Sequence, residues 1–390
     1  MENVRQLTCR DRRKGIYIIA ETGCLQPGSG ANIHIEVGIK ELEKNFEISR
    51  FHFCDPYKEI LVQNTHQVKS INPFLKSLRQ SLKWTYVLLK NHLRFFEYLR
   101  EIKKESPVFI YERAAYLNYN GILIAKLLKI PHFYEVNGIL AFDAKPFYPW
   151  IFNKISFFLE RTAYLNTKLG FFVGGINEYF KIPSHKFVII QNGIHENFTS
   201  RFEGRKNEDS GKINIVFIGH VMPHHRLDVL YEGMKLVKFP HRFCVHLIGS
   251  NLETIQDKFP ADIQTISYGV MSHEQIEEKI SDFNVGIITF ALPYYSNVKA
   301  FMYGAAKLAV VLPGSKNFEN IFDSSEVMFF KNADPSDLAD KLNYIENNSS
   351  ILPKYGENIY KKIKSEFTWE QIFNKITSEI KRGLPPDTTT

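Results

Sequence analysis

The chain alternates between short apolar runs and amphipathic stretches over nearly its whole length. Apolar runs of strand length lie at 15–20, 46–53, 107–113, 130–139, 169–173 and 186–191. A second series follows at 213–218, 242–248, 264–268, 284–289, 308–312 and 327–330. Between the runs, apolar residues recur at helical spacing, and 114–129 is one such predicted helix. Continuous apolar runs are typical of strands buried on both faces, so the pattern predicts an α/β protein with doubly wound parallel sheets.

A polar stretch divides the two series of strands. Residues 196–212 are charged and contain glycine, which is typical of a linker. With 390 residues the chain is long for one hydrophobic core, so two domains are expected, over 1–195 and 213–367. The final segment, 368–390, contains an amphipathic helix that begins at Thr368, a residue type that commonly caps helices. We therefore expect two Rossmann-like domains that face a cleft, with the ligand between them.

The stretch 213–234 is the most informative part of the second domain. An apolar strand ends at Gly219, a short polar loop follows, and a helix begins near Arg226. Such a junction brings backbone N–H groups and the positive end of a helix to one place, which suits a phosphate. Further strand ends at Gly249, Gly269 and Phe290 are expected to line the same site, because ligands bind at the carboxyl ends of parallel strands.

The first domain offers weaker signals. Gly30 ends a glycine-rich turn after the first strand, and this turn either lets a ligand approach the backbone or is only a tight turn. The pattern is not G-x-G-x-x-G, so it does not fit a dinucleotide-dependent dehydrogenase. Arg113, Glu135 and Asn137 lie at or just past strand ends, where site residues gather, although each is equally compatible with a structural polar role.

Charge points to anionic partners. The net charge is +7, which favours nucleotides, phosphates or lipid headgroups, or reflects a solvated basic surface. Residues 74–105 interleave basic and aromatic side chains, as in a helix at an anionic membrane surface or in an ordinary amphipathic helix. The aromatic-rich residues 145–164 form either a membrane-facing or acceptor-facing lip or a core helix. We expect no nucleic acid partner.

Targeting and redox signals are absent from the sequence. The first residues contain no apolar run typical of a signal peptide, and no segment approaches the roughly 20 apolar residues of a membrane-spanning helix. Cys9, Cys24, Cys54 and Cys244 show no C-x-x-C spacing. We therefore expect a cytoplasmic protein without disulfides, either free or attached to the inner face of a membrane.

The sequence resembles the glycosyltransferases of the GT-B fold, most closely the large family 4 type. The matching stretches, in chain order, are 111–113, 121–138, 188–198, 213–234, 245–250, 266–287 and 297–315. Their order and spacing carry the resemblance. The terminal helix with Trp369 resembles the one that crosses back to the first domain in this fold.

The resemblance implies an activity. Such enzymes move a sugar from a nucleotide-diphosphate donor, here UDP- or GDP-linked, to a glycan or lipid-linked acceptor, as in surface polysaccharide or glycoconjugate synthesis. Transfer in this family retains anomeric configuration, and neither a metal nor another cofactor is generally needed. The alternative is a non-catalytic partner or scaffold of an active transferase that shares the same fold.

Several phosphate-binding roles carry over by position. The family has an Arg just after the glycine of the opening loop and a Lys a few residues later, and here these positions are His220 and His225. Arg226 stands one step further, and Lys299 matches the Lys of the family's K-x-x-E-Y segment. These side chains would neutralise the diphosphate as the sugar–phosphate bond breaks. The histidines would add charge only if protonated beside a phosphate.

The family's paired glutamates are missing. In the E-x7-E motif, the first Glu falls near Tyr294 and the second, which grips the donor ribose, falls on Met302. Methionine is a weak hydrogen-bond acceptor. Either other groups hold the ribose, or the donor is unusual, or the protein no longer transfers sugar.

Further contacts follow from the family's arrangement. Gly249 and Val270 would offer backbone groups to the base, and Tyr303 would pack beside the ribose. Glu135 and Asn137 would face the sugar or acceptor, and an inverting reaction would use Glu135 as its base.

A histidine cluster in the opening loop does not indicate a metal site. His220, His224 and His225 have no carboxylate or Cys companion, and the loop is expected to hold phosphate.

Overall fold

The computed structural model describes residues 12–20, 30–53, 78–79, 81–82, 85–86, 89, 92–143, 150–205, 211–222, 225–292, 294 and 298–386. Its contacts divide the chain into two compact units. Unit 1 comprises residues 1–191 and 373–390, and unit 2 comprises residues 192–372.

Unit 1 is built on a six-stranded sheet in the order β2-β1-β3-β4-β5-β6. Its strands are β1 (Lys14–Ile19), β2 (Glu47–His52), β3 (Phe109–Arg113), β4 (His132–Val136), β5 (Leu169–Val173) and β6 (Phe187–Ile190). All neighbouring strands are parallel. Residues on both faces of the central strands are buried, which explains why they appear as unbroken apolar runs.

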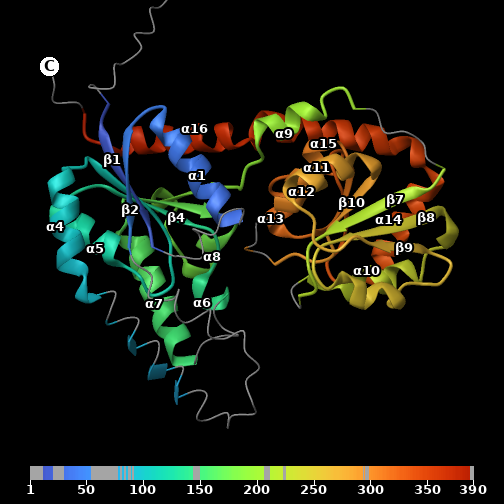
Figure 1. Ribbon diagram of the computed structural model, residues 1–390, viewed down its shortest axis with the longest axis horizontal. Helices are drawn as coiled ribbons and strands as arrows, with labels where there is room; N and C mark the ends of the chain where they lie inside the picture. Colours follow the sequence, from blue (N-terminus) through green and yellow to red (C-terminus); the bar gives the residue numbers. More distant parts are fainter. Residues whose placement is uncertain are drawn as a thin grey trace, which may run out of the picture. The chain divides into compact units, whose positions relative to one another are not determined.

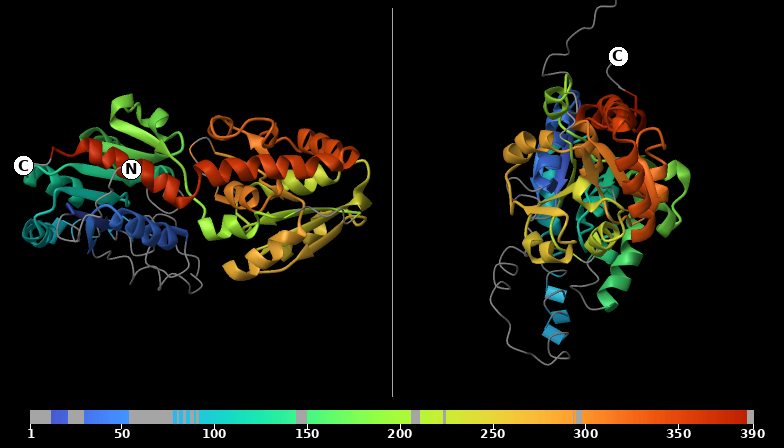
Figure 2. Two further views of the ribbon diagram at one scale, coloured as in Figure 1. Left: turned by 90° about the horizontal axis from the view of Figure 1, so that it is seen from above. Right: turned by 90° about the vertical axis from the view of Figure 1, so that its right-hand side faces the viewer.

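The helices of unit 1 cover both faces of this sheet. They are α1 (Gly30–Glu43), α4 (Phe95–Glu105), α5 (Asn120–Leu128), α6 (Leu140–Asp143), α7 (Trp150–Asn166), α8 (Ile176–Phe180) and most of α16 (Trp369–Gly383). Right-handed crossovers place α4, α5 and α7 on one face and α1 on the other (Figure 1). The carboxyl-terminal helix α16 lies beside α1 (Figure 2). The rings of His34 and Phe373 pack there in a T-shaped arrangement with their centroids 5.9 Å apart.

One predicted helix is shorter than its apolar pattern indicated. We expected a helix over 114–129, but α5 begins at Asn120. Leu117 has a positive φ of 55°, and the Asn118 side chain accepts a hydrogen bond from the Asn120 backbone N–H at 3.2 Å. This local side-chain bond competes with the helix, so residues 114–119 form a turn instead.

Unit 2 repeats the architecture with a second parallel sheet in the order β12-β11-β10-β7-β8-β9. Its strands are β7 (Ile213–Ile218), β8 (Phe243–Ile248), β9 (Gln264–Ser267), β10 (Val285–Ile287), β11 (Ala309–Gly314) and β12 (Met328–Lys331). Its helices are α9 (Glu196–Arg201), α10 (Leu227–Met234), α11 (His273–Lys279), α12 (Val298–Ala305), α13 (Lys316–Glu319), α14 (Pro335–Asn347) and α15 (Leu352–Glu366). The expected α/β class with two doubly wound sheets is confirmed.

Short 3-10 turns complete the described secondary structure. They are η3 (Ser184–Lys186), η5 (Pro240–Arg242), η6 (Leu252–Lys258), η7 (Ile280–Asp282) and η8 (Ser349–Ile351). The terminal helix α16 is capped as predicted, because the Thr368 hydroxyl accepts from the Gln371 backbone N–H at 3.3 Å. Among the described helices, none combines the length and apolar character needed to cross a membrane. Cys244 is a buried free thiol, while Cys9, Cys24 and Cys54 lie outside the described residues.

The first part of the expected linker is packed structure. Residues 196–201 form α9, and Phe198 and Phe202 are buried with their ring centroids 5.1 Å apart. The Tyr360 hydroxyl donates to the Thr199 carbonyl at 3.2 Å. The two units meet in sequence at Gln191 and Asn192, ahead of the predicted stretch 196–212. Two aromatic residues in an otherwise polar segment were the signal for this packing.

Three glycines let the loops at the carboxyl ends of β7, β8 and β9 lie against one another. The Gly219 N–H donates to the Ile248 carbonyl at 2.8 Å, and the Gly249 N–H donates to the Gly269 carbonyl at 2.7 Å. Gly249 has a φ of +136°, and a Cβ there would stand 1.5 Å from the Gly219 carbonyl oxygen. No side chain fits at position 249 without movement of the backbone.

We expect Gly249→Ala to lower the free energy of unfolding by more than about 3 kcal/mol, since it adds backbone overlap to the cost of a disfavoured φ. Gly269 has a φ of +70° but open space around it, so Gly269→Ala carries only the cost of the disfavoured φ. We expect it to lower the free energy of unfolding by about 1 kcal/mol. Gly204→Ala, in open space, is the control. Urea denaturation measures all three, and equal stability of the Gly249 and Gly204 variants would contradict the packing argument.

Candidate functional site

The candidate site of unit 2 lies where the sheet connections diverge. From β7 the chain crosses to β8, whereas from β10 it crosses to β11 in the opposite direction. Ligands of open α/β sheets bind beside such a point, at the carboxyl ends of the strands. The two strand ends are tied together here, because the Thr289 hydroxyl after β10 donates to the His225 carbonyl in the loop after β7.

Lys299 brings a largely buried amine to this point. It is the second residue of α12, and its Nζ lies 4.7 Å from the centre of the Phe217 ring. A Cβ on Gly219 would stand 2.7 Å from that Nζ, so the glycine leaves the room that the amine occupies. Burial lowers the pKa of Lys299 from 10.5 to about 8. Burying a cation costs free energy, and an anion placed beside it reduces that cost.

His225 orients this amine. Its Nδ1 lies 2.6 Å from the His220 carbonyl oxygen, which can only accept a hydrogen bond, so we infer that Nδ1 carries the proton. Its Nε2 is then an acceptor 3.3 Å from Lys299 Nζ. His225 is therefore a neutral hydrogen-bond partner of Lys299 in this structure, and the charge that we expected it to add beside a phosphate stays a prediction. The His220 side chain is exposed beside it, with the ring centroids 5.1 Å apart.

Arg226 stands at the start of α10 with its charge already matched. Its Nε and Nη2 donate to the Asp228 carboxylate at 2.9 and 2.7 Å, and this bond raises the pKa of the guanidinium. The guanidinium also lies 5.9 Å from the centre of the Phe290 ring. Asp228 was not predicted as the partner of Arg226, although the two residues lie close together in sequence at a helix start.

Tyr303 lies below the site rather than on it. Its ring is fully buried against Gly286, and its hydroxyl accepts from the Ile218 backbone N–H at 2.8 Å. We expected Tyr303 to pack beside a ribose, but it fills the core between α12 and the sheet because it lies one helical turn after Lys299.

The remaining predicted contacts of unit 2 lie along the same edge. Gly249 follows β8, and Val270 follows Gly269 after β9 with 78% of its surface exposed. Met302 is half-buried on α12, and because this residue is a methionine no carboxylate stands at that position. In unit 1, Gly30 is the first residue of α1, and the turn before it lies outside the described residues.

Glu135 of unit 1 is a buried carboxylate surrounded by donors. Tyr111 and Asn137 donate to it at 2.5 and 2.6 Å, and Arg113 donates at 2.8 Å. His34 Nε2 lies 3.1 Å from the same carboxylate. Burial by itself would raise the pKa of Glu135, but these partners hold it well below its ordinary value.

The environment of Glu135 removes it as a candidate general base. A base must reach the proton that it accepts, and Glu135 has no exposed surface. It accepts hydrogen bonds from Arg113 and Asn137, which are both partly exposed, at the end of β3 and just past β4. The expectation that Glu135 itself faces a substrate is therefore not supported by its placement.

A second buried carboxylate of unit 1 was not predicted. Glu112 on β3 lies 2.8 Å from His132 Nε2 on β4, and His132 Nδ1 lies 3.0 Å from the Thr167 hydroxyl. A Cβ on Gly121 would overlap Glu112 at 2.2 Å, so the glycine admits the carboxylate. All three polar residues are buried, which indicates a structural network.

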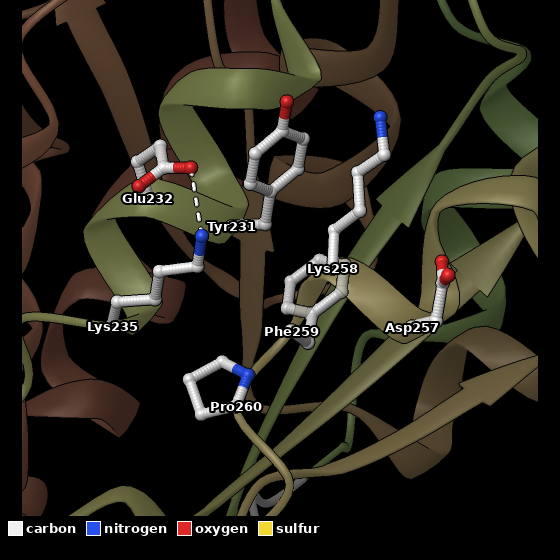
Figure 3. Close-up of a pocket in the computed structure, with 7 residues that line it drawn as sticks. All are labelled: Tyr231, Glu232, Lys235, Asp257, Lys258, Phe259 and Pro260. Atoms are coloured by element: carbon white, nitrogen blue, oxygen red, sulfur yellow. Dashed lines mark hydrogen bonds and ion pairs between the residues drawn. The ribbon is translucent and has the colours of Figure 1, made fainter.

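A separate hollow of about 600 Å³ in unit 2 lies between α10 and η6 (Figure 3). Lys235 and Lys258 flank Tyr231, with their Nζ atoms 5.5 and 5.4 Å from the ring centre. Glu232 pairs with Lys235 at 2.8 Å. None of the predicted site residues lines this hollow. Within the described ranges, no group of three or more His, Cys, Asp or Glu side chains is arranged to hold a metal ion.

Comparisons with known proteins agree with the fold and with the resemblance. A sequence profile of the family described as glycosyl transferase-like matches residues 260–378. No curated protein matches the sequence. The resemblance to group 1 glycosyltransferases is thereby confirmed for the carboxyl-terminal part of the chain.

Solved structures extend the likeness to both units. A glycosyltransferase from Rickettsia africae has 15% identity and a TM-score of 0.65, with 97% of this chain and 100% of that chain covered. The lipopolysaccharide outer core galactosyltransferase WaaB has 15% identity and a TM-score of 0.67, with 95% and 100% covered. HepE from Anabaena, in complex with UDP and glucose, has 13% identity and a TM-score of 0.64, with 95% and 100% covered. At these identities the likeness establishes the fold.

We expect the burial of Lys299 to appear as a pH-dependent stability. Below pH 8 the amine is charged in both the folded and the unfolded protein, so the folded protein bears the full cost of burying the charge. Between pH 8 and 10.5 the folded protein loses the proton first, so this cost disappears as pH rises. Across that window, the free energy of unfolding of wild type should rise by up to about 3 kcal/mol relative to that of Lys299→Met, as measured by urea denaturation. Lys235→Met, at an exposed lysine, is the control, and parallel curves for wild type and Lys299→Met would contradict the burial.

Glu135→Gln should lower the free energy of unfolding by about 2 kcal/mol or more at pH 7, because the charge that holds Arg113 and its neighbours is removed. The pKa of Glu135 is depressed in the folded state, so this difference should be complete above pH 4.5 and shrink as pH falls below it. Glu97→Gln, at an exposed carboxylate paired with Arg94, should change little. A pH-independent loss would mean that shape rather than charge matters at position 135.

Proposed function

Because the chain resembles the GT-B glycosyltransferases in sequence and fold, we propose that it moves a sugar from a nucleotide-diphosphate donor to a glycan or glycolipid acceptor. The bond between the anomeric carbon and the phosphate oxygen breaks, and the diphosphate keeps the electron pair. The acceptor hydroxyl forms the new bond to the anomeric carbon and loses its proton. Surface polysaccharide or glycoconjugate synthesis on the cytoplasmic side of a membrane is the setting that fits this reaction.

The buried amine of Lys299 is the observation that carries the proposal. It lies at the first turn of α12 and next to Gly219, where the positive end of the helix and the loop after β7 meet. Negative charge develops on the diphosphate as the bond breaks, and a fixed cation stabilises that charge. With a pKa of about 8, Lys299 is mostly protonated at neutral pH, and a phosphate beside it would raise that pKa.

Arg226 is the second proposed phosphate ligand. It is paired with Asp228 and both side chains are partly exposed, so a phosphate can replace the carboxylate as its partner. His220 is exposed at the same loop and adds a hydrogen-bond donor. Gly249 and Val270 would offer backbone groups to the base at the neighbouring strand ends.

We propose retention of anomeric configuration. An inverting reaction needs a general base, and the burial of Glu135 removes the candidate that the sequence offered. In the retaining reaction, an oxygen of the leaving diphosphate accepts the proton of the incoming hydroxyl. Asn137 and Arg113 are proposed to contact the sugar or acceptor, both held in place by Glu135. A UDP-sugar is the first donor to test, since HepE was solved with UDP and with UDP-glucose.

A non-catalytic partner of an active transferase is the second candidate, and Met302 favours it. The family's ribose-binding carboxylate is missing there, so the grip on the nucleotide is weakened. A scaffold would keep the fold and lose donor binding, which the following measurement distinguishes.

Isothermal titration with UDP, GDP, ADP and CMP tests the proposal. We expect micromolar binding of one nucleotide, a loss of at least tenfold with Lys299→Ala, and little change with Lys235→Ala as the matched control. Binding near pH 8.5 should also take up a proton, visible as a dependence of the heat on the buffer's ionisation enthalpy, because phosphate recharges Lys299. If none of the four nucleotides binds, donor transfer is refuted and the scaffold is favoured.

A further inference from the structure

Unit 1 exposes many apolar side chains, chiefly on α5, α7, the start of α4 and described residues before it. The described residues include eleven large hydrophobic side chains that are exposed on α5, α7, the start of α4 and the residues just before α4. They are Leu78, Leu82, Tyr86, Leu89, Leu93, Phe96, Leu123, Leu127, Ile151, Ile155 and Phe158. Helices α4, α5 and α7 cover the same face of the sheet (Figure 1). Soluble surfaces rarely expose apolar groups in such a concentration unless the surface binds something.

The outer faces of α5 and α7 carry regular apolar stripes. On α7, Ile151, Ile155 and Phe158 recur at helical spacing with 47%, 43% and 67% of their surface exposed. On α5, Leu123 and Leu127 are 41% and 61% exposed. The opposite side of each helix packs against the sheet, so these residues are additional to the core. The buried side of α7 agrees with the core-helix alternative for 145–164, whereas the membrane-facing or acceptor-facing alternative stays a prediction.

An apolar pocket of about 280 Å³ lies between α5 and α7. Its walls include Tyr119, Ile122 and Leu123 from α5 and its N-terminal cap, and Leu159 and Ala163 from α7. Its lining is completed by His92, Lys126, Thr162 and Asn166, and the exposed Lys126 donates to Asn166 at 2.5 Å. An apolar cavity with a few polar groups at its edge is typical of a ligand site.

Charge identifies the kind of surface that this face would meet. Helices α5 and α7 expose Lys126, Lys154 and Arg161. The carboxylate of α7, Glu160, is buried and accepts from Ser156 and from the Ala141 backbone N–H at 2.9 and 2.8 Å. No acidic side chain is exposed on either helix within the described residues, so a second copy would oppose like charges. A surface with apolar stripes, whose exposed charged side chains are all positive, fits an anionic lipid surface.

We propose that the face formed by α5 and α7 docks on an anionic lipid bilayer and that the pocket between these helices takes one acyl chain. The exposed leucines, isoleucines and Phe158 enter the boundary between headgroups and chains. Lys126 stands at the pocket to meet the phosphate of the lipid whose chain enters. This binding requires no sugar transfer, so it does not rest on the proposed function.

Vesicle sedimentation with the full chain tests the docking surface. We expect binding to vesicles of phosphatidylcholine with phosphatidylglycerol, weakened by high salt, and little binding to phosphatidylcholine alone. Phe158→Gln and Leu127→Gln should each weaken binding at least fivefold. Tyr344→Gln, at a residue of unit 2 with 52% exposure, is the control. Equal sedimentation of wild type and both variants would overturn the proposal, as would a dimer that Leu127→Gln converts to a monomer.

A monomeric lipid separates the pocket from the surface. Lysophosphatidylglycerol below its micelle concentration should bind to wild type in isothermal titration. Leu123→Gln, which alters the pocket wall, should lower that affinity at least fivefold, while Leu127→Gln, on the same helix but outside the pocket, should not. The same loss in both variants, or no binding to wild type, would overturn the acyl site. Circular dichroism checks that each exposed-site variant is folded.

Discussion

A desolvated cation at the carboxyl end of β7 is the constraint on which the second unit depends. The Lys299 amine reaches Gly219 because that residue has no side chain, and His225 can accept from it because the His220 carbonyl holds the opposite ring nitrogen. One turn later, Tyr303 anchors the same helix to the Ile218 backbone. Strand, loop and helix therefore share one arrangement, and an anion bound there would reduce the cost of burying the amine.

The first unit buries a group of the opposite charge near the carboxyl end of one of its strands. Glu135 lies near the carboxyl end of β4 and is fully buried; its charge is balanced by Arg113, while Tyr111 and Asn137 donate hydrogen bonds to it. The balance is complete within the unit, so this carboxylate is stable without a ligand. One unit thus holds a satisfied anion that orients its neighbours, and the other holds a cation suited to a partner from solution.

The strands and the position of Lys299 could be predicted because both depend on local sequence. Strands buried on both faces appear as unbroken apolar runs, and the lysine lies in a recognisable segment beside a helix start. The partners of Glu135 could not be predicted, since His34 is far away in sequence and only the topology brings it close. Asp228 and the packing of Phe198 were visible but not distinctive, because polar loops and isolated aromatic residues have many explanations. Of the basic stretch 74–105, residues 92–105 are described without a gap and include α4, with Tyr98 and Ile102 buried as in an ordinary amphipathic helix.

The three glycines at the ends of β7, β8 and β9 have a consequence for how this site can diverge. Position 249 is closed to every side chain by the Gly219 carbonyl, and Gly219 shares its space with the Lys299 amine. A ligand at this edge therefore meets bare backbone, whose hydrogen-bonding groups are the same in any descendant that keeps the fold. Discrimination between ligands then falls to neighbouring side chains such as the exposed Val270. Backbone groups would bind what all ligands of this edge share, and side chains would select among them.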